Sequence, residues 1–195
     1  MTSRVHAGRL RRELRFSKSA VKANLSALGL STKEARPVID AVMTNDGLLG
    51  LYGTELLLLE KVLGLATETP AVRLVGELVS VKQVPAGTGI SYGHLAKTSE
   101  STNLGLVALG FSDGIPRAAT NELVVKIQSK TYKNVGRIAM DQLIIDLGSD
   151  TPSIGSEVEL FGSAQTLAQL AALTGFSPLE IIGRIPARVA RTWSE

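Results

Sequence analysis

With 195 residues, of which 44% are hydrophobic and 20% charged, the chain suits one globular domain with an appendage rather than a disordered segment. It has no cysteine, and His6 and His94 lie in no ligand-spaced motif, so we expect neither disulfides nor a metal site. The net charge is only +3, no apolar run reaches the roughly 18–20 residues that cross a bilayer, and the N-terminus lacks the apolar segment of a signal peptide. We therefore expect a cytoplasmic protein that binds no membrane.

The first third of the chain is basic and predicted to be helical. Residues 1–36 carry nine Lys and Arg against two acidic residues, whereas the rest is mildly acidic. Such an arm binds nucleic acid in some proteins, but a charge run is more often a solvated face, and we favour that interpretation. We expect helices over 17–30, with Ser17 or Ser19 as cap, over 33–43, with Pro37 in its first turn or at a kink, and over 54–65.

After Pro70 the pattern changes to short strands separated by turn residues. Alternating or apolar runs predict strands over 72–84, 90–93, 104–110, 123–127, 132–138, 143–147 and 157–161, with a turn at 85–89. Helices are expected over 166–174 and 177–182, and residues 183–193 are expected to be irregular or extended. Strands at this spacing favour a mainly β, closed or nearly closed domain at 70–195, preceded by a short helical segment at 1–69.

Five phrases in the β-rich part occur in a particular order. They are VPAGTGISYG (84–93), LGFSDGIPR (109–117), VGRIAMDQ (135–142), IGSEVELFG (154–162) and RIPARVAR (184–191). From about residue 72 to 193 the chain resembles the C-terminal β-domain of alanine racemases, which implies a β-barrel-like fold.

Two earlier segments resemble the same family. Residues 45–53 (NDGLLGLYG) are similar to the stretch that leads from the racemase barrel into the β-domain, and residues 13–28 resemble the first strand and helix. In the family a complete cofactor barrel lies between these two pieces. Only about fifteen residues separate them here, whereas a (β/α)₈ barrel needs roughly 200, so the resemblance implies that nearly all of the barrel is missing.

The resemblance implies pyridoxal phosphate chemistry that interconverts L- and D-alanine for cell-wall synthesis. In the family a barrel lysine holds the cofactor, and a tyrosine from the partner subunit's β-domain supplies the second base. We assign that tyrosine position to Phe111, whose ring has no proton to exchange. Trp193 stands at about the position of the family's phosphate-binding tyrosine; its indole N–H donates one hydrogen bond but is bulkier and differently directed.

Two other candidates follow from the resemblance. Met140 corresponds to a residue whose backbone N–H meets the substrate carboxylate, and Asp113 continues the phrase around Phe111, so both are candidate substrate-binding residues. The alternative is that such residues hold turns and loops. We favour that alternative for all of them: Met140, Asp113, Gly114, Arg117, Arg137 and Arg188. We assign no catalytic role to Tyr92 or Tyr132.

Lys22 lies in a phrase, AVKAN (20–24), that is similar to the family's cofactor-binding phrase. It also lies inside the predicted helix 17–30, whereas a cofactor lysine sits at the end of a barrel strand. We interpret it as a solvated helix lysine, because tertiary context decides what such a short motif means.

Three functions remain open. The first is a catalytically inactive module, without a cofactor of its own, that pairs with itself or with a barrel-containing partner chain. The inner face, which family β-domains turn toward the partner's barrel, is then an exposed interface, or the helix over 55–65 covers it. The second is one part of a split racemase whose cofactor, pyridoxal phosphate, binds the other chain. The third, a nucleic-acid-binding β-barrel, is disfavoured because the few aromatic residues do not cluster with the arginines.

Overall fold

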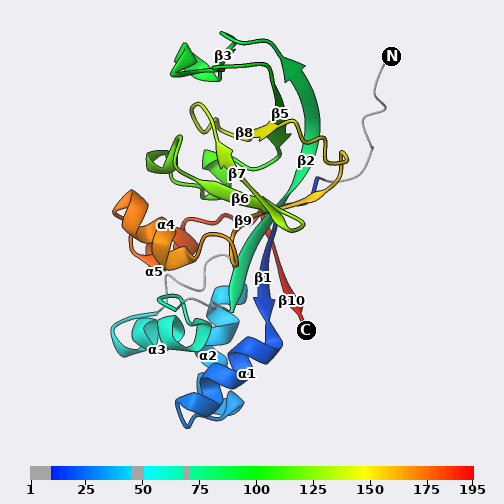
Figure 1. Ribbon diagram of the computed structural model, residues 1–195. Helices are drawn as coiled ribbons and strands as arrows, with labels where there is room; N and C mark the ends of the chain where they lie inside the picture. The colour runs from blue at the N-terminus through cyan, green and yellow to red at the C-terminus, as the bar shows by residue number, and fades with distance from the viewer. Residues whose placement is uncertain (1–9, 45–50, 68–70) are drawn as a thin grey trace.

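The computed structural model describes residues 10–44, 51–67 and 71–195, and it confirms the expected mainly β fold (Figure 1). Six strands form a closed antiparallel barrel in the order β2-β5-β8-β7-β6-β9, and β9 returns to pair with β2. Their bounds are β2 Val72–Val84, β5 Thr102–Val107, β6 Val124–Ile127, β7 Lys130–Asn134, β8 Leu143–Gly148 and β9 Glu157–Phe161. The expected strands over 104–110 and 132–138 therefore end earlier, and loops occupy their last residues.

The long strand β2 closes the barrel because it has different neighbours along its length. Its first half pairs with β9 through Leu74–Glu77, and its second half pairs with β5 from Leu78 to Val84. A register shift between Leu78 and Ser80 marks the bend, as is common where strands curve. Gly76 lies in the part of β2 that pairs with β9, and a Cβ there would come 2.5 Å from Cδ1 of Leu109. The alternating buried residues of the barrel strands fill its interior.

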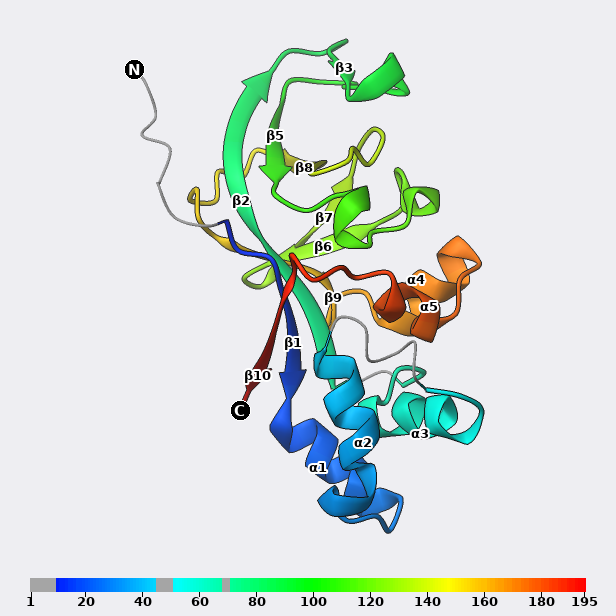
Figure 2. The same cartoon turned by 180° about the vertical axis from the view of Figure 1, so that it is seen from behind.

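Two more strands, β1 (Glu13–Ser17) and β10 (Ala190–Ser194), extend the sheet beyond the barrel. β1 pairs antiparallel with β2 and parallel with β10, which brings the two ends of the described chain together (Figure 2). Leu14 and Phe16 are fully buried and alternate with half-buried polar residues. Residues 13–17 thus belong to the sheet of the body, although they lie in the segment that the sequence indicated to be helical.

The three predicted N-terminal helices are present as α1 (Lys18–Ala27), α2 (Thr32–Met43) and α3 (Thr54–Leu63). The Ser17 hydroxyl caps α1, and Ser31 with Glu34 forms a capping box on α2, which continues through Pro37. Helix α3 packs against α1, α2 and α5.

The remaining elements surround the barrel. Helices α4 (Leu167–Thr174) and α5 (Pro178–Gly183), which the sequence predicts, flank one side (Figure 1). A small hairpin joins β3 (Gly89–Ile90) to β4 (Ala96–Lys97), with the 3₁₀ turn η2 (Tyr92–His94) between them. Two further 3₁₀ turns, η3 (Phe111–Asp113) and η4 (Arg117–Ala119), follow β5. Buried residues of α1–α3 and of the barrel form one continuous core.

Candidate functional site

Three loops meet at one end of the barrel. The backbone N–H of Phe111 donates to Ala139 O at 2.8 Å, and the N–H of Ser112 donates to Met140 O at 2.8 Å. The hydroxyl of Ser91 donates to Arg137 O at 2.7 Å and attaches the hairpin turn to the same loop. We call the surface formed by residues 91–92, 111–112 and 139–142 the loop face.

Gly110 allows the two main loops to approach. A Cβ at this position would lie 2.5 Å from Ala139 O, 2.6 Å from Met140 O and 2.6 Å from the backbone nitrogen of Gln142. All three are backbone atoms, which cannot move aside as a flexible side chain does. A glycine is therefore needed here for close packing, although its extended φ of −150° suits any residue.

Asp113 lies beneath the loop face and is fully buried. Its Oδ2 accepts the backbone N–H of Gly110 at 2.8 Å, and its Oδ1 accepts Nε of Arg188 at 2.8 Å. Nε of Arg12 lies 3.4 Å from Oδ1 and donates to Ala108 O at 2.9 Å. Both carboxylate oxygens are thus engaged within the chain, by arginines that come from near its two ends.

Arg188 also reaches the surface of the loop face. Its Nη2 lies 2.8 Å from Oδ1 of Asp141 and donates to the Ser112 hydroxyl, which in turn bonds Met140 O at 2.6 Å. Hydrogen bonding to Asp113 raises the pKa of Arg188, and hydrogen bonds from Arg188 and Ser112 lower the pKa of Asp141. One guanidinium therefore connects the two main loops through charge-assisted bonds.

The candidates from the sequence do not all lie together. Phe111 and Met140 are neighbours on the loop face, with 42% and 56% of their surface exposed. Asp113 lies below them. Trp193 is on β10, where its ring packs against Phe16 with the centroids 5.8 Å apart.

The structure adds Tyr92, which the sequence analysis left without a role. Its side chain is 69% exposed and lines a cleft of about 330 Å³ together with Arg137, Ala139 and Gln142. Ser91 and His94, on either side of it, have φ values of 57° and 47°. Non-glycine residues with positive φ are uncommon and often occur at functional turns, and this backbone signal is not visible in the sequence.

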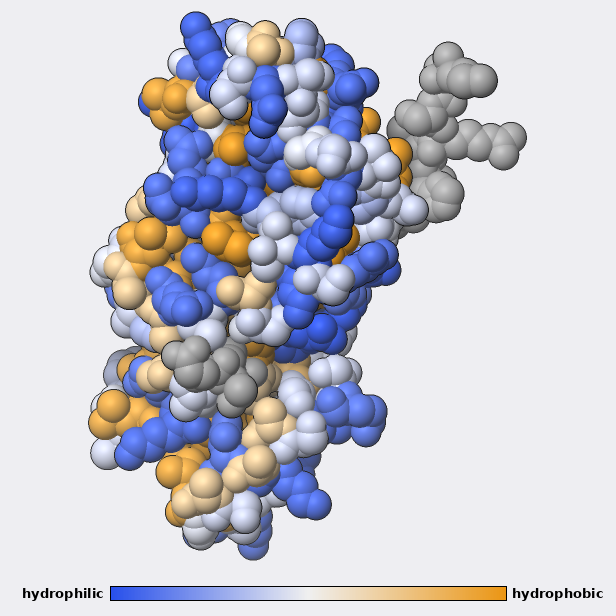
Figure 3. All heavy atoms as spheres, in the orientation of Figure 1, coloured by the Kyte–Doolittle hydropathy of each residue, from blue (hydrophilic) through white to orange (hydrophobic). Residues whose placement is uncertain are grey.

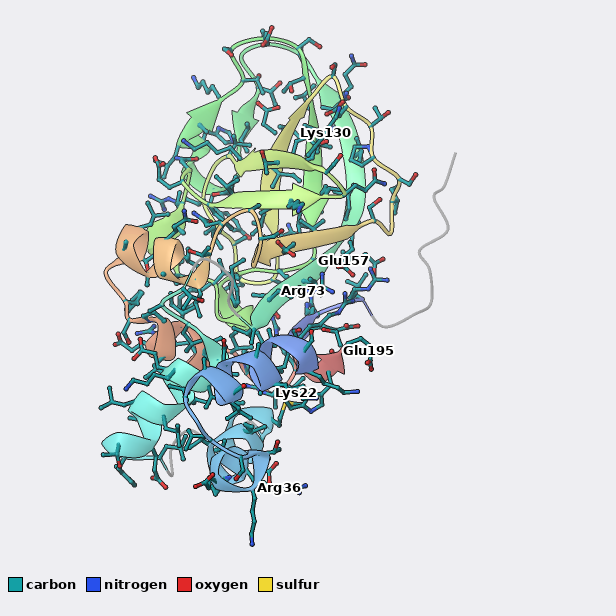
Figure 4. All side chains as sticks on the ribbon, turned by 60° about the horizontal axis from the view of Figure 1, so that its bottom comes forward. Lys22, Arg36, Arg73, Lys130, Glu157 and Glu195 are labelled. Atoms are coloured by element: carbon teal, nitrogen blue, oxygen red, sulfur yellow. The ribbon has the colours of Figure 1, made fainter. Side chains whose placement is uncertain are left out.

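Lys22 lies on α1 and is exposed, outside the barrel (Figure 4). The family's cofactor lysine lies on a strand of the parallel (β/α)₈ cofactor barrel. The barrel that the described residues form is a different one, because every strand pairing in it is antiparallel. Neither the position of Lys22 nor its surroundings fit a pyridoxal phosphate site.

Much of the positive charge of the basic arm is neutralised within the chain. Arg15 pairs with Glu13 and with Glu157, both at 2.7 Å, and Arg11 lies 3.6 Å from Glu157. Arg73 lies 3.7 Å from Glu157, and these two residues and Arg15 line a cleft of about 690 Å³ over β1, β2 and β9 (Figure 4). The surface there is hydrophilic (Figure 3). This cleft lies away from the loop face. The pairing supports the solvated-face interpretation over a nucleic-acid site.

The residues that the structure describes hold no group of three or more His, Asp or Glu placed to bind a metal ion. None of their helices combines the length and the apolar character that a bilayer crossing requires.

The fold and the site define a class of protein: a closed antiparallel barrel domain with paired loops at one end, joined to a small helical segment. Residues 71–193 match the family model for the alanine racemase C-terminal domain, and the chain belongs to that family. The predicted resemblance is confirmed.

Similar proteins are complete racemases. The alanine racemase of Streptomyces coelicolor is 44% identical over 128 residues, which are 64% of this chain and 33% of that protein. Its solved structure superposes with a TM-score of 0.62 and covers 65% of this chain and 34% of that one. The alanine racemase of Bartonella henselae, solved with covalently bound pyridoxal phosphate, is 27% identical with a TM-score of 0.61 over 64% of this chain and 35% of that one. The chain thus spans about a third of the length of these relatives.

Proposed function

We propose that this chain is a racemase β-domain module that does not racemise alanine by itself and that presents its loop face to a protein partner. The observation that carries the proposal is the contrast between two regions. The loop face is held in place by Asp113 and Arg188, whereas the helices α1–α3 offer no barrel strand for a cofactor lysine.

The exposed side chains of the loop face support a protein partner. Phe111, Met140 and Tyr92 are large apolar or aromatic residues that are 42–69% exposed. Aromatic residues and Met are enriched at protein interfaces, and a cluster of them on a surface is unusual in a protein that meets no partner. Asp141 and Arg188 supply a polar rim.

The absence of racemisation by the chain alone also follows from proton chemistry. Racemisation needs two bases on opposite faces of the α-carbon. Phe111 cannot supply one if it holds the family's tyrosine position, and Lys22 is displaced from any cofactor site. The test measures conversion of L-alanine to D-alanine by the purified chain with added pyridoxal phosphate, followed by borohydride reduction and peptide mass spectrometry. We expect no conversion and no lysine captured specifically. Conversion above background, or reduction of the cofactor onto one particular lysine, would contradict the proposal.

A second candidate function is supported by Tyr92. A phenol hydroxyl accepts and donates protons, and this one lies exposed on the face that would meet a partner. The chain would then complete a racemase site on a separate barrel chain. Mixing it with a barrel chain distinguishes the two candidates: activity that is lost in Tyr92→Phe supports the split enzyme, and activity that appears only with Phe111→Tyr supports the inactive module.

A further inference from the structure

The cleft of about 690 Å³ over β1, β2 and β9 also reaches β6 and carries a net positive charge. Its charged lining consists of three cations and two carboxylates: Arg15, Arg73, Lys126, Glu157 and Glu159. Arg11 and Glu13 contact this set from outside the lining, and their opposite charges cancel. We call this feature the charged cleft.

The two carboxylates of the charged cleft are engaged within the chain. Oε2 of Glu157 pairs with Nη1 of Arg15 at 2.7 Å. Oε1 of Glu159 accepts the backbone N–H of Ser163 at 2.6 Å and the Ser163 hydroxyl at 2.7 Å, and only 12% of the Glu159 side chain is exposed. The negative charge therefore has partners of its own.

The cations Arg73 and Lys126 keep hydrogen-bond donors to spare. The carboxylate oxygens nearest to Nη1 of Arg73 lie 3.7 Å away on Glu157 and 3.8 Å away on Glu159, too far for a good hydrogen bond (Figure 4). Lys126 lies opposite Glu159 in the pairing of β6 with β9, yet its Nζ donates to the Ser163 hydroxyl at 2.8 Å, and it forms no ion pair with a described residue. Since a guanidinium has five N–H donors and an ammonium three, most of these donors find no acceptor in the described chain.

The backbone around these cations is also unusual. Arg73 lies directly opposite Arg15 in the pairing of β1 with β2, an arrangement of like charges that destabilises a sheet. A Cβ on Gly162 would lie 2.9 Å from Cβ of Arg73 and 2.8 Å from Cδ of Glu159, so the glycine leaves room beside both side chains. Gln128, which also lines the cleft, has a φ of 55°. Such strain in a non-glycine residue often marks a binding site.

We propose that the charged cleft binds the phosphate group of a small molecule between Arg73 and Lys126. A phosphate monoester carries a charge of about −1.5 to −2 and three acceptor oxygens, which match two cations that approach from β2 and β6. A carboxylate has a single charge and two oxygens, and therefore matches them less well. The cleft is as large as typical small-molecule sites, roughly 300–1,000 Å³, so an organic group also fits beside the phosphate.

The charged cleft is separate from the loop face, so its test does not depend on whether the chain racemises alanine. The test is an NMR titration of the full ¹⁵N-labelled chain with inorganic phosphate, with sodium chloride adjusted to hold the ionic strength constant. We expect saturable shifts at the amides of Arg73, Gln128 and Ser163 and at Nε of Arg73. Glycerol 3-phosphate should bind at least as tightly as phosphate, and acetate should bind more weakly.

Charge-removing variants locate the site. Arg73→Gln and Lys126→Gln should each raise the dissociation constant for phosphate by about tenfold or more, as the loss of a charge-assisted hydrogen bond predicts. Arg73→Lys keeps the charge but loses the planar fork, and should lie between Arg73→Gln and the wild type. Lys97→Gln is the matched control, because it removes the same charge from an exposed position on the hairpin strand β4 and should change binding by less than about twofold.

Three outcomes would overturn the proposal. The first is the lack of saturable shifts in the wild-type chain up to about 20 mM phosphate. The second is acetate binding as tight as phosphate binding. The third is an equal effect of Arg73→Gln, Lys126→Gln and Lys97→Gln, since binding would then follow the net charge of the chain and not this cleft.

Discussion

The buried carboxylate of Asp113 supports the loop face from beneath. Replacing it with alanine leaves the N–H of Gly110 without its acceptor and leaves Arg188 and Arg12 beside a cavity instead of a charge. Removing one partner of a buried ion pair costs about 3–5 kcal/mol, because the other charge stays buried and uncompensated. Part of Arg188 reaches solvent, with 36% of its side chain exposed, so we expect a value toward the lower end.

The assay is urea unfolding followed by circular dichroism, together with thermal unfolding. For a chain of this size each 1 kcal/mol shifts the melting temperature by about 2–4 °C, so Asp113→Ala should melt at least about 6 °C below the wild type. Asp113→Asn keeps an oxygen for hydrogen bonding, so its free energy of unfolding should fall by less, about 1–3 kcal/mol.

Asp40 provides the matched control. It also pairs with an arginine, Arg36, at 3.5 Å, but both side chains are exposed, and ion pairs on the surface contribute little. Asp40→Ala should therefore unfold close to the wild type. If Asp113→Ala were no more destabilising than this control, the argument that the buried ion cluster holds the loop face would be wrong.

Three further outcomes are expected. Gly110→Ala should lower the free energy of unfolding by about 1–3 kcal/mol, measured in urea, because its Cβ meets three backbone atoms of the facing loop; wild-type stability would contradict this packing. The pKa of Asp141 is held below its ordinary value of 3.8, first by Arg188 and then by Ser112, so its stabilisation is present above that pH and is lost as the pH falls through the lower folded value. The urea midpoints of wild type and Asp141→Asn should therefore differ at neutral pH and converge in acid; a constant difference would refute this. Phe111→Tyr in the chain alone should produce no D-alanine in a racemisation assay, because this chain still has no cofactor barrel with a lysine for pyridoxal phosphate.

Local patterns predicted most of the secondary structure. The alternation in 72–84, 143–147 and 157–161 corresponds to β2, β8 and β9 almost residue for residue, and Ser17 caps α1 as expected. These elements are visible in the sequence because side-chain period and capping chemistry act within a few residues.

Other elements were decided by distant partners. Strands β1 and β10 are only five residues long and carry several polar side chains, so their strand character depends on pairing between the two ends of the chain. Residues 90–93, expected as a strand, turn instead into η2, where Ser91 and Gly93 adopt positive φ. The hydrophobic periodicity does not predict that the chain turns here, because the turn is held by a hydrogen bond from the Ser91 hydroxyl to the backbone oxygen of Arg137, 46 residues away.

The sequence by itself determined the mainly β class, the helical beginning and the family. Only the tertiary structure decided that Asp113 lies beneath the loop face rather than on it, that Tyr92 lines a cleft with Ala139 and Gln142, and that β10 is the terminal strand of the sheet. The physical reason is the range of the interactions. Local preferences act between neighbours along the chain, whereas burial, ion pairing and strand edges depend on residues such as Arg12 and Arg188, which meet only when the chain has folded.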